Sequence, residues 1–177
     1  KHNLEYKNCN MEKIVLDNIS IKNNLVEYHY SVSSGIKKFF TTDCMFIEYE
    51  EDMTNVPTSI LTIPFVNCMA GLSWLADCVL FVDEIDATYY DSFKDLKVAY
   101  NELHRYMGLK GMLVPSKLIE NKINITNDKG LLLWGGGVDC HTSFIQNKEN
   151  ISHILNIYGW LKTIDENNKV DKSDKEQ

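Results

Sequence analysis

The residues best suited to chemistry lie between Asp128 and Phe144, in the segment DKGLLLWGGGVDCHTSF. Three glycines follow an apolar run, and an aspartate, a cysteine, a histidine and two hydroxyl residues come after them. Because a glycine inside an element costs about 0.5–1 kcal/mol, three in succession need a reason. Glycines let a phosphate approach the backbone, and the N–H groups at a helix start bind anions. The segment therefore predicts a strand, a phosphate-binding turn and the start of a helix.

Three familiar nucleotide-binding loops do not fit this segment. A Walker-type loop closes with a lysine and a Ser/Thr residue, whereas these glycines lead to Val138 and Asp139. A Rossmann loop needs a third glycine where this chain has Cys140. A methyltransferase-like loop has an acidic residue two positions before its first glycine, and Leu133 stands there. A simple strand-to-helix turn that binds nothing remains an open alternative.

The stretch GGGVDC resembles the S-G-G-x-D-S loop of the PP-loop ATP pyrophosphatases. This superfamily includes the ATP domains of asparagine synthetase and GMP synthetase and the tRNA-thiolation enzymes. Gly136, Gly137 and Asp139 match the pattern, while Gly135 and Cys140 replace its two serines. The resemblance implies that the loop holds the pyrophosphate of ATP while AMP passes to a carboxylate, amide or carbonyl oxygen.

The resemblance also assigns roles to residues. It implies ATP and Mg²⁺ as cofactors and gives Asp139 a catalytic role, either shaping the loop or positioning Mg²⁺. His141, Thr142 or Ser143 would partly replace the missing serine hydroxyls. The residues expected to bind the nucleotide are Gly135, Gly136, Gly137, Val138, Asp139, Cys140, His141 and Thr142.

The order of elements is similar to one branch of that superfamily, the bacterial UDP-N-acetylmuramoyl-L-alanyl-L-glutamate epimerase and related proteins encoded near cell-wall or capsule genes. This wider similarity is a pattern of elements over residues 11–160, and only the glycine loop is a motif. It implies adenylation of a glutamate carboxylate before epimerisation, a role in cell-wall biogenesis, and a small acidic or carboxylate-bearing substrate.

Hydrophobic periodicity predicts an α+β domain over residues 11–126, after a flexible arm at residues 1–10. The expected elements are three antiparallel strands within residues 13–50, a buried helix within 56–77 that is broken near Pro64, a strand at 78–86, an amphipathic helix at 89–107 capped by Asp86 or Thr88, and an edge strand at 110–119. The acidic residues Asp83, Glu84 and Asp86 are interpreted as a strand end and a helix cap.

A second domain, a partial PP-loop nucleotide-binding domain, is expected over residues 130–163. It would contain a strand at 131–134, a helix at 139–146 and a strand at 151–160, followed by a polar, disordered tail at 164–177. The expected fold class is therefore α/β. An open nucleotide-binding sheet needs about five parallel strands, so we expect an incomplete domain that is inactive alone, either a fragment or completed by another copy or partner segment.

Composition narrows the classes of function. Hydrophobic residues make up 44% of the chain and its net charge is −7, which disfavours nucleic acid and anionic membranes as partners. Five dispersed cysteines predict reduced, mostly buried thiols in a cytoplasmic protein. The apolar stretch 60–80 is interrupted by Pro64 and Asp77, so it predicts a core helix rather than a membrane span. The competing class is a non-catalytic interaction module with a degenerate loop.

Overall fold

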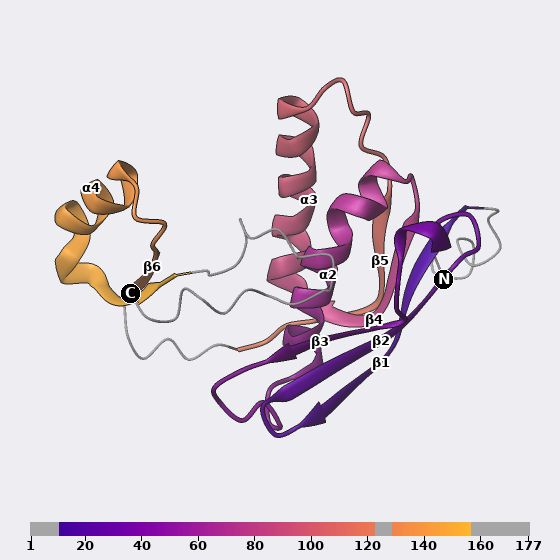
Figure 1. The fold of residues 1–177 in the computed structure, drawn as a ribbon, viewed down its shortest axis with the longest axis horizontal. Coiled ribbons are helices and arrows are strands. Elements are labelled where there is room, and N and C mark those ends of the chain that lie inside the picture. Colours follow the sequence, from indigo (N-terminus) through magenta and orange to yellow (C-terminus); the bar gives the residue numbers. More distant parts are fainter. Residues whose placement is uncertain (1–10, 123–128, 157–177) are drawn as a thin grey trace. The chain divides into compact units, whose positions relative to one another are not determined.

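The computed structural model describes residues 11–122 and 129–156 (Figure 1). The chain divides into two compact units, residues 1–122 and residues 123–177, and each is considered by itself. The first unit contains a five-stranded sheet in the order β3-β2-β1-β4-β5, and the second a two-stranded sheet. The fold is therefore mixed α/β, as the sequence predicted. The predicted arm at residues 1–10 and tail at 164–177 lie outside the described residues.

One half of the large sheet is an antiparallel meander of β1 (Lys13–Lys22), β2 (Leu25–Val32) and β3 (Cys44–Glu48). Asn23 has a φ of 57°, the left-handed value that Asn tolerates in a tight hairpin turn. The three strands were predicted, but the third begins later than expected. Residues 37–39 form the 3₁₀ helix η1 instead, because the chain here leaves the sheet and packs Ile36 and Phe40 onto the core.

The other half of the sheet is parallel. β1 pairs with β4 (Val79–Asp86), and β4 pairs with β5 (Met112–Ile119), which is an edge strand as predicted. The helices α2 (Thr58–Leu75) and α3 (Ala87–Leu103) form the two crossovers. Right-handed crossovers made in the same direction place both helices on one face of the sheet. The α+β interpretation of this region missed these parallel pairings.

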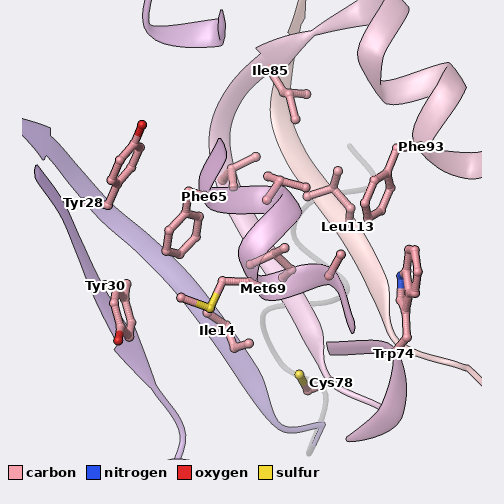
Figure 2. Packing of buried hydrophobic residues seen from close by; sticks show 14 of the residues in the cluster. Ile14, Tyr28, Tyr30, Phe65, Met69, Trp74, Cys78, Ile85, Phe93 and Leu113 are labelled. Carbon is pink, nitrogen blue, oxygen red and sulfur yellow. The ribbon is translucent and has the colours of Figure 1, made fainter. Parts of the chain in front are cut away.

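Helix α2 is the centre of the core. Its buried residues recur at helical spacing, and Phe65 lies 6.0 Å from Tyr28 and 5.7 Å from Tyr30 between ring centroids. Figure 2 shows Phe65 and Met69 pointing toward the strand side chains Ile14, Tyr28 and Tyr30. At its C-terminal end, Trp74 packs against Phe93 of α3 at 5.3 Å. The core thus joins both halves of the sheet through one helix.

Two predictions concern α2, a break near Pro64 and a place in the core rather than in a membrane. The predicted break near Pro64 is wrong, because the helix continues through this residue. Pro64 cannot donate to the carbonyl four residues earlier, but packing of the buried face holds the helix together. Among the described residues, α2 is the one helix long and apolar enough to cross a membrane, and half of that window is buried inside the protein.

Helix α3 begins where the sequence predicted. Asp86 is its N-cap, and its carboxylate accepts a hydrogen bond from the Tyr89 amide at 2.8 Å. The helix ends at Leu103, and a turn follows up to Gly108, whose φ of 59° suits glycine. Only Phe93 of this helix is buried. The acidic cluster at the end of β4 therefore includes a helix cap, as interpreted, and no group of three His, Cys, Asp or Glu residues in the described ranges could hold a metal.

Candidate functional site

The glycine segment lies in the second unit, between β6 (Gly130–Leu133) and α4 (Val138–Asn147). The short 3₁₀ helix η2 (Lys148–Asn150) then leads into β7 (Ile151–Leu155). The strands β6 and β7 are parallel, and the Trp134 amide extends the pairing by donating to the Leu155 carbonyl at 2.7 Å. This is the strand–turn–helix–strand order that the sequence predicted. All eight predicted site residues lie in the turn or in the first five residues of α4.

The three glycines have different backbone conformations. Gly136 has a φ of 77°, in the left-handed region that L side chains rarely adopt. Gly137 is the N-cap of α4 with a φ of −79° and a ψ of 171°, which any residue can adopt. A Cβ atom added to Gly135, Gly136 or Gly137 would meet no atom within 4 Å. Open space therefore borders the whole glycine turn.

The amides at the start of α4 are the main hydrogen-bond donors of the site. The first N–H groups of a helix have no acceptor within the helix. Within residues 129–156, no acceptor is found for the amides of Gly136, Gly137, Val138, Asp139 and Cys140. These five donors and the positive end of the helix dipole provide the chemistry of an anion site.

Other predicted donors are used within the turn itself. The Gly135 amide donates to the Cys140 thiol at 3.3 Å, and the His141 amide donates to the Gly137 carbonyl at 3.3 Å. The Thr142 hydroxyl donates to the Val138 carbonyl at 2.9 Å, which is a local helix contact. The Thr142 hydroxyl is thus engaged within the helix in this conformation, and the expectation that His141, Thr142 or Ser143 partly replaces the missing serines stays a prediction.

Histidine and tryptophan form a small cluster beside the turn. Nδ1 of His141 lies 3.0 Å from the Gly137 carbonyl, and its ring centroid lies 4.6 Å from that of Trp134. Phe144 adds an edge contact to Trp134 at 6.1 Å. Trp134 was not predicted to belong to the site, although its position directly before the glycines was a usable signal. The cluster fixes the His141 ring against the strand side of the turn.

Asp139 lies in the first turn of α4 and is exposed. A carboxylate is favoured at a helix N-terminus by the helix dipole. It also repels a phosphate group unless a cation lies between the two charges. Carboxylate oxygens are ligands that Mg²⁺ prefers, and Mg²⁺ usually keeps phosphate and water ligands beside one or two carboxylates. Asp139 therefore offers one exposed carboxylate beside the free amides of the helix start.

Apolar side chains of the second unit are unusually open to solvent. Leu131 is 59% exposed, Leu133 56% and Ile154 51%, all on the two parallel strands. Parallel sheets normally bury both faces beneath helices. The two strands and single helix described here therefore leave apolar sheet surface uncovered.

A cavity in the first unit was not predicted. It has a volume of about 510 Å³ and lies beside β2 and the segment that leads from η1 to β3. The composition of the segment KKFFTTD predicts a strand, and nothing in it indicates that its side chains line a cavity.

No protein-family model, curated protein or solved structure matches the chain.

Proposed function

We propose that the protein binds ATP through the turn and helix start at residues 135–142 and adenylates a carboxylate or similar acceptor, with release of pyrophosphate. The class is that of the PP-loop ATP pyrophosphatases. Within this class, the resemblance to the branch of the cell-wall precursor epimerase suggests the acceptor. The acceptor would be the carboxylate of an amino acid, activated in the cytoplasm. ATP, when bound, supplies the AMP group.

The glycine turn carries the proposal. The positive φ of Gly136 favours glycine, but Gly135 and Gly137 do not have such a φ. Neither of them lies against a neighbouring atom that a Cβ would displace. An ordinary turn requires glycine only where φ is positive, so this reason does not apply to Gly135 and Gly137. The need for an unobstructed approach by a phosphate would account for the other two glycines.

The residues of the helix start have complementary roles in this proposal. The amides of Gly136, Gly137, Val138 and Cys140 would hold the pyrophosphate portion of ATP, because their N–H groups have no acceptor in the described part of the chain. Asp139 would contribute a carboxylate oxygen to Mg²⁺, which offsets phosphate charge. No lysine or arginine lies between Leu131 and Gln146, so backbone donors and Mg²⁺ must balance the anion.

A Gly137→Ala variant tests the proposal with little risk to folding. The new methyl group meets no protein atom and the φ is ordinary, so the only expected cost is that of alanine at an N-cap, at most about 1 kcal/mol. The same methyl group would occupy space next to the bound phosphate. We expect titration calorimetry with Mg²⁺–ATP to show saturable binding to the wild type and at least about a tenfold loss of affinity in the variant, which is 1.4 kcal/mol.

Gly71→Ala is the matched control. Gly71 is exposed in α2, and a Cβ there also meets nothing within 4 Å. This variant should bind Mg²⁺–ATP as the wild type does. Asp139→Asn should weaken binding mainly in the presence of Mg²⁺ and less in its absence. Absence of saturable binding by the wild type, or equal binding by Gly137→Ala, would contradict the proposal.

A second candidate is a non-catalytic interaction module. Two observations favour it. The amide of Gly135 and the hydroxyl of Thr142 are satisfied within the turn, and apolar side chains are exposed on β6 and β7. A module would bind a protein partner through those strands and would not bind ATP, so the titration distinguishes the two candidates.

A further inference from the structure

The cavity of the first unit lies where β3 separates from β2. The two strands pair from Glu48 back to Cys44, and the Tyr30 amide continues the contact by donating to the Asp43 carbonyl at 3.0 Å. Beyond this point the chain leaves the sheet through Phe40 and η1. The volume of about 510 Å³ lies within the range of small-molecule sites. Its lining residues are Asp17, Tyr30, Ser31, Val32, Lys37, Phe40, Thr41, Thr42 and Asp43.

One wall of the cavity is held in place by packing and hydrogen bonds. The rings of Tyr30 and Phe40 lie 5.6 Å apart between centroids, and Tyr30 is buried. The Tyr30 hydroxyl donates to the Thr42 carbonyl at 2.9 Å, and the Thr42 hydroxyl donates to the Cys44 carbonyl at 3.0 Å. A small ligand would therefore meet a preformed aromatic and polar wall, which reduces the entropy lost on binding.

The cavity is lined by charges of both signs. Lys37 provides an ammonium group, and Asp17 and Asp43 provide carboxylates. Among the described residues, no ion pair within 4.0 Å joins any of these three groups to another charged side chain. Asp17 accepts one hydrogen bond, from the Ser31 hydroxyl at 3.2 Å, and it lies at a bulge in β1, between Leu16 and Asn18. Bulges of this kind redirect side chains and are common beside binding sites.

We propose that this cavity binds a small zwitterion of the peptide type, with a free ammonium group, a free carboxylate and an apolar side chain. The ammonium lies against Asp17 and Asp43, and the carboxylate against Lys37. The apolar side chain lies against Phe40 and Val32. A ligand of one sign would pair with one part of the lining and be repelled by the other, whereas a zwitterion satisfies both parts through charge-assisted hydrogen bonds. The inference is independent of the proposed ATP site.

The dipeptide L-alanyl-L-leucine is a suitable probe, because its two ends can be neutralised one at a time. Titration of the ¹⁵N-labelled protein should give saturable amide shifts confined to residues around the cavity. N-acetylation of the probe removes the ammonium, and C-terminal amidation removes the carboxylate. Each change should weaken binding by about tenfold, because charge-assisted bonds are stronger than neutral ones. Equal binding of the three compounds, or shifts outside the cavity, would overturn the proposal.

Charge-neutralising variants identify the protein groups. Lys37→Gln should weaken binding of the dipeptide about tenfold. It should have little effect on binding of the amidated probe, which lacks the carboxylate. Lys38→Gln makes the same charge change at the next residue, which does not line the cavity, and should leave binding unchanged. Asp17→Asn keeps an acceptor for the Ser31 hydroxyl. It should weaken binding of the dipeptide more than binding of the acetylated probe. Equal effects of the Lys37 and Lys38 substitutions would show a general charge effect and would overturn the proposed site.

Discussion

Asp86 shows how one carboxylate joins three elements of the first unit. Its Oδ1 accepts from the Tyr89 amide at the start of α3, and its Oδ2 accepts from the Asn121 side chain at 2.9 Å. The same Asn121 amide group donates to the Ser59 hydroxyl of α2 at 3.0 Å. The hydrogen bond from Asn121, followed by that from Tyr89, holds the pKa of Asp86 below its ordinary value of 3.8.

This lowered pKa predicts a dependence of stability on pH. Because the folded protein favours the charged form, Asp86 contributes stability above pH 3.8, and the contribution is lost as the pH falls through the lower pKa of the folded state. In Asp86→Asn, which keeps a capping oxygen, the free energy of unfolding should fall less steeply below that pH. Urea unfolding at several pH values measures this free energy. Asp83→Asn, which changes an exposed aspartate, is the control. Parallel curves for the wild type and Asp86→Asn would contradict the assignment.

The cysteines are less buried than the sequence predicted. Of the four in the described residues, Cys78 alone is buried, Cys44 and Cys140 are half-buried, and Cys68 is exposed on α2. Composition gives the average burial of a residue type, but it does not give the face of a helix on which a particular cysteine lies. Burial also raises the pKa of the Cys78 thiol to about 11.

Alkylation of the native protein should therefore be selective. Iodoacetamide reacts with the thiolate, so Cys68 should be modified readily and Cys78 only after unfolding. Peptide mass spectrometry before and after addition of guanidinium chloride measures both. Rapid modification of Cys78 under native conditions would contradict the packing shown in Figure 2.

At the scale of single elements, local sequence patterns were informative. The apolar residues that recur at helical spacing from Tyr89 onward, together with the capping residue Asp86, predicted α3. The alternation of apolar and polar residues in β1 and β2 predicted a hairpin. Two errors have physical causes. The segment before Cys44 has strand-like composition, but Ile36 and Phe40 pack better in a turn. Pro64 normally ends a helix, but a long buried face outweighs one missing hydrogen bond.

Pro64 gives a prediction about α2. Replacing it with alanine restores the donor to the helix interior and improves helix propensity, so Pro64→Ala should raise the free energy of unfolding by about 1–3 kcal/mol. Pro57 precedes the first residue of the same helix, where the helix supplies no acceptor for an N–H, so Pro57→Ala is the control and should have little effect. Urea denaturation measures both. A loss of stability in Pro64→Ala would show that the pyrrolidine ring packs more favourably than the restored hydrogen bond.

At the scale of the whole molecule, the sequence predicted the order of elements but not all of their pairings. The parallel contact between β1 and β4 joins residues separated by two strands and a helix, and no local pattern specifies it. For the candidate site, the sequence identified the turn, the helix start and the position of Asp139. It could not show that the Gly135 amide and the Thr142 hydroxyl are satisfied within the turn, because those contacts depend on side-chain rotamers.

The exposed leucines of β6 predict self-association. Uncovered apolar strand surface promotes contacts between molecules. Replacing Leu131 and Leu133 together with threonine keeps residues that favour strands but removes most of the apolar surface. The double variant should associate less in sedimentation velocity runs at increasing concentration. Leu103→Thr, which changes a leucine that is 73% exposed in the first unit, is the control. Unchanged association in the double variant would contradict this expectation.

The indole of Trp134 lies against the imidazole of His141, directly beside the glycine turn. An event at the turn that moves this ring alters the surroundings of a natural fluorophore. The protein therefore contains its own optical probe for the site, and stopped-flow emission measurements can follow occupancy in real time without an attached dye.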